Sequence, residues 1–242
     1  MVFEVTGEQA MKPWHEISFA KIIPRTSDTK SFRFKKPDGF QHQAGQWMYV
    51  NIKVNDLVKL HHFTISSSPT EDFLVFTKKI TDSDYSKALD HICEGDWAKI
   101  SGPYGSFTYA GEPIKIGALT GGIGITPLRS ICKYCADKTL PTSIVMLYSN
   151  KTRDEIVFKE QLDEMMASDP NIDVRYVLTR QPDWNGLKGH IDGDMIKAQI
   201  PDYKDRTFYI CGPPAMNQAL KKALGNLVPE SQIKLEDFTG YE

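Results

Sequence analysis

The residues whose types and spacing suit chemistry best form a glycine-rich turn in the second half of the chain. It reads Gly121-Gly122-Ile123-Gly124-Ile125-Thr126-Pro127, after an apolar run and before an expected helix. Glycines let a backbone approach a pyrophosphate closely, and the first amides of the next helix point at such an anion. A proline in the first helical turn removes an amide that would be unpaired anyway. The turn predicts a phosphate site, with a purely structural tight turn as the alternative. The expected contacts are Thr120, Gly121, Gly122, Gly124, Thr126 and Pro127.

A second group follows the next apolar run, which ends in Tyr148-Ser149-Asn150-Lys151, with Arg153 close by. In dinucleotide folds an acidic residue commonly takes the ribose hydroxyl at this place. Here Ser149 offers a hydroxyl, and Lys151 and Arg153 suit the 2′-phosphate of NADPH or are solvated loop charges. The choice between NADH and NADPH stays open.

The cysteines do not indicate a metal or disulfide site. Cys132 and Cys135 are three positions apart in an apolar stretch, where residues i and i+3 share one face of a helix, and we expect them to pack there. A zinc site would need two further soft ligands, so we expect no metal. Four cysteines are too few for a disulfide scaffold, which suits a reduced, cytoplasmic setting.

Charge and hydropathy exclude some partners. The net charge is -2, which provides no general attraction for nucleic acid. No apolar run approaches the roughly 20 residues that cross a bilayer, so we expect no membrane insertion. The first residues lack the basic and apolar regions of a signal peptide.

Two stretches of different periodicity must position these residues. Residues 15–110 show short alternating segments separated by turns, typical of an antiparallel sandwich or closed barrel, with one helix over 86–93. From residue 114, apolar runs alternate with helical stretches over 127–137, 154–167, 194–198 and 214–224, typical of a doubly wound parallel α/β sheet. We predict an N-terminal antiparallel β-barrel in residues 1–110 and a parallel α/β domain in residues 111–242.

Four further segments carry a resemblance. They are Ala44-Gly45-Gln46, His61-His62-Phe63-Thr64-Ile65-Ser66, Gly102-Pro103-Tyr104-Gly105 and Cys211-Gly212-Pro213-Pro214-Ala215-Met216. With the glycine turn between the last two, their order resembles that of the ferredoxin–NADP reductase superfamily, over nearly the whole chain. The resemblance implies a flavin barrel, with FAD as cofactor, followed by a pyridine-nucleotide domain that binds NAD(P)H.

The resemblance also implies roles in the flavin segment. Phe63 takes the place of an aromatic residue against the isoalloxazine, and Thr64 that of a hydroxyl near N5, the hydride acceptor. His61 replaces an arginine that pairs with the flavin phosphate. A neutral histidine donates without a fixed charge, which leaves FMN or a loosely held flavin as alternatives. His62, Ile65 and Ser66 are further expected flavin contacts.

A second flavin-phosphate contact is expected between 77 and 86. Ser86 is expected as a helix N-cap, whose amides hold an anion, and a capped surface helix is the alternative. Lys78 or Lys79 would supply the charge that His61 lacks. Thr77 and Tyr85 complete this expected set.

The resemblance places Cys211 beside the nicotinamide C4, where it shapes the pocket for hydride transfer. Gly212, Pro213 and Met216 are expected to line the same cleft. Near the C-terminus, Glu236 matches a carboxylate that orders the site. Phe238 matches an aromatic that covers the flavin, with Tyr241 as an alternative.

The predicted activity is therefore that of a flavin-dependent NAD(P)H oxidoreductase. We expect a redox protein as acceptor, carrying an iron–sulfur cluster or a flavin: a ferredoxin, a flavodoxin or an oxygenase component. This chain has no cysteine quartet for such a cluster. The alternatives are a free-flavin or ferric reductase and a nucleotide-sensing subunit without turnover.

Overall fold

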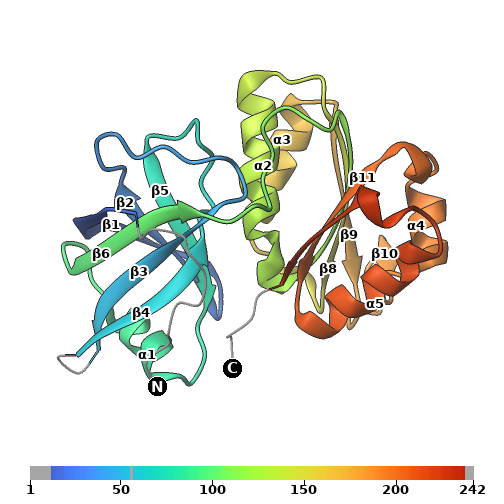
Figure 1. The fold of residues 1–242 in the computed structure, drawn as a ribbon. Coiled ribbons are helices and arrows are strands. Elements are labelled where there is room, and N and C mark those ends of the chain that lie inside the picture. The colour runs from blue at the N-terminus through green and yellow to red at the C-terminus, as the bar shows by residue number, and fades with distance from the viewer. Residues whose placement is uncertain (1–11, 55–56, 238–242) are drawn as a thin grey trace.

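The computed structural model describes residues 12–54 and 57–237, and these form two sheets joined by a short connection. Figure 1 shows the first sheet and its helix α1 on the left and the second sheet with its helices on the right. No helix in the described ranges is both long and apolar enough to cross a bilayer.

The first sheet is antiparallel, with six strands in the order β4-β3-β6-β1-β2-β5. The two end strands, β4 and β5, meet where the Ser66 amide donates to the Val75 carbonyl at 2.7 Å. The sheet is thus rolled up, and we call the meeting of β4 and β5 the barrel seam. The strands are β1 Trp14–Thr26, β2 Thr29–Lys35, β3 Trp47–Val54, β4 Leu57–Thr64, β5 Phe73–Lys79 and β6 Trp97–Tyr104.

Alternating side chains of these strands fill the barrel. Phe32, Phe34 and Phe76 are fully buried in one cluster, and the rings of Phe32 and Phe76 stack at 4.9 Å. The helix α1 (Asp84–His91) adds Tyr85 and Leu89 to the same cluster. The period-2 pattern therefore predicted this half because one face of each strand is apolar.

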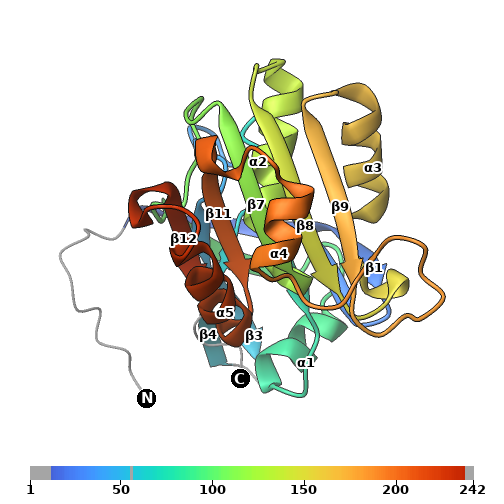
Figure 2. The ribbon, with the colours of Figure 1, turned by 90° about the vertical axis from the view of Figure 1, so that its right-hand side faces the viewer.

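The second sheet has the order β10-β9-β8-β7-β11-β12, and all its strand pairs are parallel. Helices α2 and α3 pack on one face, and α4 and α5 on the other (Figure 2). The strands are β7 Lys115–Gly121, β8 Ser143–Asn150, β9 Ile172–Leu178, β10 Leu187–Lys188, β11 Thr207–Gly212 and β12 Ile233–Asp237. The helices are α2 Ile125–Lys138, α3 Lys159–Ser168, α4 Gly193–Gln199 and α5 Pro214–Gly225. The predicted fold class, an antiparallel barrel followed by a doubly wound parallel sheet, is confirmed.

One predicted helix begins later than expected. The expected stretch over 154–167 contains a 3₁₀ turn at Arg153–Glu155, and α3 starts only at Lys159. Phe158 precedes it with φ of 63°, in the left-handed region that interrupts a right-handed helix. Its ring is buried in the core on the α2–α3 face.

The two sheets also contact each other through polar side chains. The Ser130 hydroxyl of α2 donates to the Ser67 carbonyl at 2.7 Å, and the Tyr209 hydroxyl of β11 donates to the Thr108 carbonyl at 3.0 Å. The domain boundary that the sequence predicts, between 110 and 111, falls between β6 and β7. The two hydrogen bonds above each join a residue before that boundary to one after it, and so connect the two domains.

Candidate functional site

The glycine turn lies at the carboxyl end of β7 and packs directly against the end of β11. A Cβ added to Gly124 would lie 2.3 Å from the Cys211 carbonyl oxygen. One added to Gly121 would lie 2.5 Å from Sδ of Met216. The clash at Gly124 is with backbone and excludes any side chain, so glycine is required there by the close approach of two strand ends, whereas at Gly121 the end of the Met216 side chain would have to move. The strand order reverses at β7: β8, β9 and β10 follow on one side of it, and β11 and β12 lie on the other. Open α/β sheets bind ligands at such a topological switch point, at the carboxyl ends of the strands.

Hydrogen bonds fix the shape of the turn. The Thr120 hydroxyl donates to the Cys211 carbonyl at 2.7 Å, and the Tyr148 hydroxyl donates to the Gly122 carbonyl at 2.9 Å. The Thr126 hydroxyl donates to the Ile123 carbonyl at 3.2 Å, in the first turn of α2. Gly122 has φ of +54° with open space where a side chain would be. The turn thus forms a rigid, open cradle before a helix N-terminus.

The structure gathers most of the expected nucleotide residues at this switch point. Pro127 is buried in the first turn of α2, Gly212 is buried at the end of β11, and Pro213 is exposed just before α5. Cys211 is fully buried. These positions fit a nucleotide because the cradle offers backbone amides and room for a pyrophosphate.

The residues expected to select between NADH and NADPH lie at the end of β8. Ser149 is half-buried, whereas Lys151 and Arg153 are exposed, and neither cation has an ion pair in the described part of the chain. The loop backbone is held: the Arg153 amide donates to Oε1 of Gln181 at 2.7 Å. The preference between NADH and NADPH stays a prediction.

The expected flavin-phosphate residues meet at the barrel seam. The rings of His61 on β4 and Tyr85 on α1 lie 4.1 Å apart. Lys78 on β5 is only 6% exposed, and burial lowers its pKa. Partial burial, followed by the charge of Lys78, lowers the pKa of His61 as well. A buried ammonium beside a neutral imidazole suits the recognition of an anion. Thr77 lies behind them, with its hydroxyl 2.8 Å from that of Ser31.

Lys79, the other lysine considered, lies apart from the seam. It is exposed, and its ammonium pairs with Asp28 at 2.7 Å. Adjacent residues of a strand point to opposite faces, which separates Lys78 from Lys79.

The prediction that Ser86 caps α1 is wrong. The helix begins at Asp84, and the N-cap is Ser83, whose hydroxyl accepts from the Ser86 amide at 3.3 Å. Ser86 is buried in the first turn, with its hydroxyl 3.0 Å from that of Thr81. Serine suits an N-cap at either position, and the helix begins one residue after the first of the two.

Phe63 and Thr64 lie on opposite faces of β4. Phe63 is 1% exposed, and its ring stacks on Phe76 at 4.5 Å inside the barrel. Thr64 is buried on the outer side of the strand, where it pairs in register with Trp47 of β3. His62 shares this outer side, and its ring lies 5.2 Å from that of Trp47. Burial lowers the pKa of His62.

Trp47 is a residue that sequence reasoning missed. It follows Ala44-Gly45-Gln46 and contacts Tyr104 at 4.9 Å between rings. A Cβ on Gly105 would lie 2.7 Å from its indole, so two of the quoted segments meet at this ring. Because Trp47 directly follows Ala44-Gly45-Gln46, the sequence could have indicated that its ring lies near these segments.

Residues after Thr64 connect the seam to the nucleotide domain. The Ile65 amide donates to the Gln46 carbonyl at 2.9 Å, and Ile65 is buried in the barrel. The Ser66 carbonyl accepts from Nη1 of Arg129 on α2 at 3.2 Å. In addition, Cα atoms of β5 lie within 8 Å of the glycine turn. The seam and the cradle are therefore neighbours.

The C-terminal predictions are only partly within the described residues. Glu236 lies on β12 in register with Cys211, and its carbonyl accepts from Nδ2 of Asn217 at 2.9 Å. Phe238 and Tyr241 lie outside the described residues.

Cys132 and Cys135 are both buried in the core beneath α2. Burial raises the pKa of both thiols, that of Cys135 to about 12. Protonated thiols in an apolar core fit packing, which is the role expected from their spacing.

Comparisons with known proteins agree with this arrangement. Residues 14–108 match the model of a FAD-binding domain, and residues 119–222 match that of an oxidoreductase NAD-binding domain. The chain is 27% identical over 220 residues to the glycine betaine monooxygenase reductase subunit of Chromohalobacter salexigens, covering 87% of this chain and 60% of that protein. It is 36% identical over 178 residues to NADH-cytochrome b5 reductase 1 of Coccidioides immitis, covering 68% of this chain and 58% of the relative. It thus spans about 60% of the length of these curated relatives.

A solved structure shares the fold. The ferredoxin NADP+ reductase of Neisseria gonorrhoeae, with bound FAD and NADP, superposes with a TM-score of 0.80 at 18% identity, covering 93% of this chain and 98% of that one. A FAD-binding barrel comes first, an NAD-binding sheet follows, and the chain belongs to the ferredoxin–NADP reductase superfamily.

Proposed function

We propose that the protein is a FAD-dependent NAD(P)H oxidoreductase that passes electrons to a separate redox protein. One observation carries the proposal: strand β5, which carries the buried Lys78, has Cα atoms within 8 Å of the glycine cradle. When bound, FAD supplies the chemistry, accepting a hydride from the nicotinamide and releasing electrons to the acceptor. The chain supplies placement and exclusion of water.

The residues have separate tasks in this proposal. Lys78 and His61 hold the flavin phosphate at the seam, and the amides after Gly122 hold the nucleotide pyrophosphate. The Thr64 hydroxyl donates a hydrogen bond to the flavin. Cys211 keeps the nicotinamide pocket narrow, since its carbonyl is fixed by Thr120 at 2.7 Å.

The acceptor is proposed from the relatives. Their names include a monooxygenase reductase subunit and a cytochrome b5 reductase, both of which point to a protein acceptor. We infer an acceptor carrying an iron–sulfur cluster or a haem. The cysteines of this chain do not form a set of ligands for an iron–sulfur cluster, so such a cluster would lie on the acceptor.

The test is anaerobic rapid mixing of the FAD-loaded protein with NADH and, separately, NADPH. Thr64→Val should slow flavin reduction by one to two orders of magnitude, the scale expected for loss of an oriented donor. Thr64→Ser keeps the hydroxyl and should reduce at nearly the original rate. Equal rates in all three proteins would remove Thr64 from the mechanism. Nucleotide binding without bleaching would instead indicate a sensing subunit, and release of reduced flavin a free-flavin reductase.

A further inference from the structure

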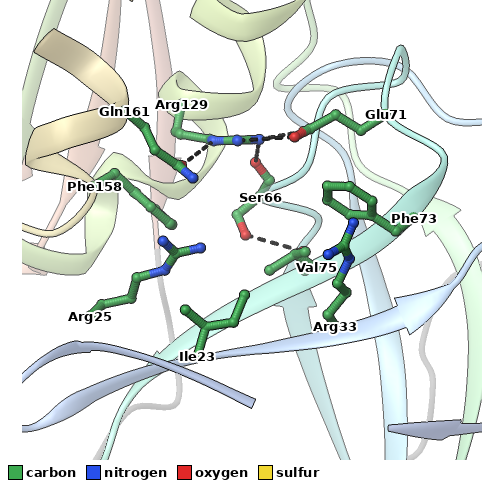
Figure 3. Close-up of a pocket in the computed structure, with 10 residues that line it drawn as sticks. All are labelled: Ile23, Arg25, Arg33, Ser66, Glu71, Phe73, Val75, Arg129, Phe158 and Gln161. Atoms are coloured by element: carbon green, nitrogen blue, oxygen red, sulfur yellow. Dashed lines mark hydrogen bonds and ion pairs between the residues drawn. The ribbon is translucent and has the colours of Figure 1, made fainter. Parts of the chain in front are cut away.

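A polar cavity lies between the domains, on the outer face of the barrel. Its volume is about 140 Å³, and it is enclosed by β1, β2 and β5 on one side and by α2 and the start of α3 on the other. Figure 3 shows Arg25 and Arg33 reaching into it from the barrel, and Arg129 and Gln161 from the nucleotide domain. We call this cavity the arginine pocket.

Two of its three guanidinium groups lack a counter-ion. Arg129 pairs with Glu71, but Arg25 and Arg33 have no carboxylate within ion-pair distance among residues 12–54 and 57–237. Burial, and then the charge of Arg129, lowers the pKa of Arg25 to about 10, although Glu71 and Glu160 act in the opposite direction. The pocket therefore holds an excess of positive charge that an anion would stabilise.

Aromatic rings fix these two cations in place. The guanidinium carbon of Arg33 lies 3.4 Å from the centre of the Phe73 ring, and that of Arg25 lies 5.0 Å from the centre of the Phe158 ring. Stacking occupies the faces of the guanidinium planes and leaves their edges to donate. The Arg25 side chain uses only Nε, toward the Ser31 hydroxyl at 2.8 Å, and the Arg33 side chain makes no hydrogen bond within the described residues. Their terminal amino groups are thus available in a fork that matches an oxyanion.

Glu71 does not compete for these groups. Its Oε1 accepts from Nη2 of Arg129 at 3.0 Å, and its Oε2 accepts from the Ser68 amide at 2.6 Å and from Nη1 of Arg129. Both of its carboxylate oxygens are therefore hydrogen-bonded to Arg129, and it acts on Arg25 only as a nearby charge.

We propose that the arginine pocket binds a small dianion carrying a phosphate group, which ties the barrel to the nucleotide domain. A volume of about 140 Å³ is several times that of one water molecule, roughly 30 Å³ in the liquid, so a phosphate fits. Arg25 and Arg33 belong to the barrel, and Arg129 and Gln161 to the nucleotide domain, so one ligand would contact both. Phe73 lies on the face of β5 opposite that of Lys78, which separates the pocket from the flavin-phosphate residues.

The test is calorimetric titration of the FAD-loaded protein with inorganic phosphate, at constant ionic strength and with saturating NAD+. Saturation occupies the two other sites expected to hold phosphates. We expect binding, and at least a tenfold rise in Kd in Arg25→Gln and in Arg33→Gln. Lys222→Gln, which removes an exposed charge on α5, should leave Kd unchanged. A parallel arm with glycerol phosphate identifies the source: tighter binding than phosphate indicates a phosphomonoester, and weaker binding free phosphate.

Both arginines are half-exposed, so the variants should fold, and Arg33→Lys provides a second check. It keeps the charge but loses the fork, and should raise Kd at least threefold. Phosphate should also raise the melting temperature of the wild type and not that of the double variant Arg25→Gln with Arg33→Gln. No phosphate binding by the wild type, or equal binding by the wild type and the double variant, would overturn the proposal.

Discussion

The ion pair between Arg129 and Glu71 links the two domains. Their side chains are only 7% and 12% exposed. Glu71→Gln keeps the size of the side chain but leaves the buried guanidinium without a counter-charge. At 3.0 Å between Nη2 and Oε1, and with an effective dielectric constant of about 20, the attraction is roughly 5 kcal/mol. The glutamine retains a hydrogen bond, so we expect a loss of about 3 kcal/mol, at the low end for a broken buried pair.

Urea denaturation and thermal melting measure this loss. For a chain of this size, about 3 kcal/mol corresponds to a fall in melting temperature of roughly 6–12 °C. The double variant Glu71→Gln with Arg129→Met should regain most of it, because no buried charge is left unpaired. Lys133→Gln breaks only the more exposed pair with Asp137 and should cost less than about 1 kcal/mol. A Glu71→Gln protein that loses less than about 1 kcal/mol would refute the reasoning.

Three further predictions concern the seam, the barrel and the cradle. Lys78→Gln should weaken FAD binding at least tenfold by flavin-fluorescence titration, whereas Lys79→Gln should not; equal affinities would exclude Lys78 from the flavin site. Burial lowers the pKa of His42 to about 4 in the folded protein. As the pH falls, His42 is protonated near pH 6.5 in the unfolded chain but only near pH 4 in the folded protein. The free energy of unfolding therefore decreases between about pH 6.5 and 4, by up to about 3 kcal/mol. His42→Gln should flatten the pH dependence of urea midpoints over that range, and an unchanged slope would contradict the assignment. Gly124→Ala should raise the Kd for NADH at least tenfold, because its Cβ would meet a carbonyl at 2.3 Å, while Gly225→Ala, in open space, should not.

Local patterns predicted those parts of the fold in which neighbouring residues decide the outcome. Strands of the barrel alternate apolar and polar residues because one face packs inward, and β7 is buried from Ile116 to Gly121 because helices cover both faces of its sheet. The start of α3 could not be predicted in this way. Phe158 has a left-handed backbone, and its ring is buried in the core. That burial depends on residues distant in the sequence, so the local pattern did not indicate where the helix begins.

The candidate site likewise contains parts that the sequence could predict and parts that depend on tertiary contacts. The glycine cradle is contiguous in sequence, so its position at a strand end could be predicted. Strand parity separates Lys78 from Lys79, because Lys78 shares the parity of the buried Leu74 and Phe76, and that signal was present in the sequence. In the arginine pocket, Arg25 and Arg33 come from the neighbouring strands β1 and β2, but Arg129 comes from α2 about a hundred residues later, and only folding brings it to them.

The most direct test of the central claim is anaerobic mixing of the purified, FAD-loaded protein with NADH, followed by flavin absorbance. We predict that FAD is bound in about one equivalent per chain and that NADH bleaches it, with slower bleaching in Thr64→Val and Gly124→Ala. Subsequent addition of an oxidised redox protein should restore the colour. Flavin that stays oxidised with saturating NADH and saturating NADPH would contradict the claim.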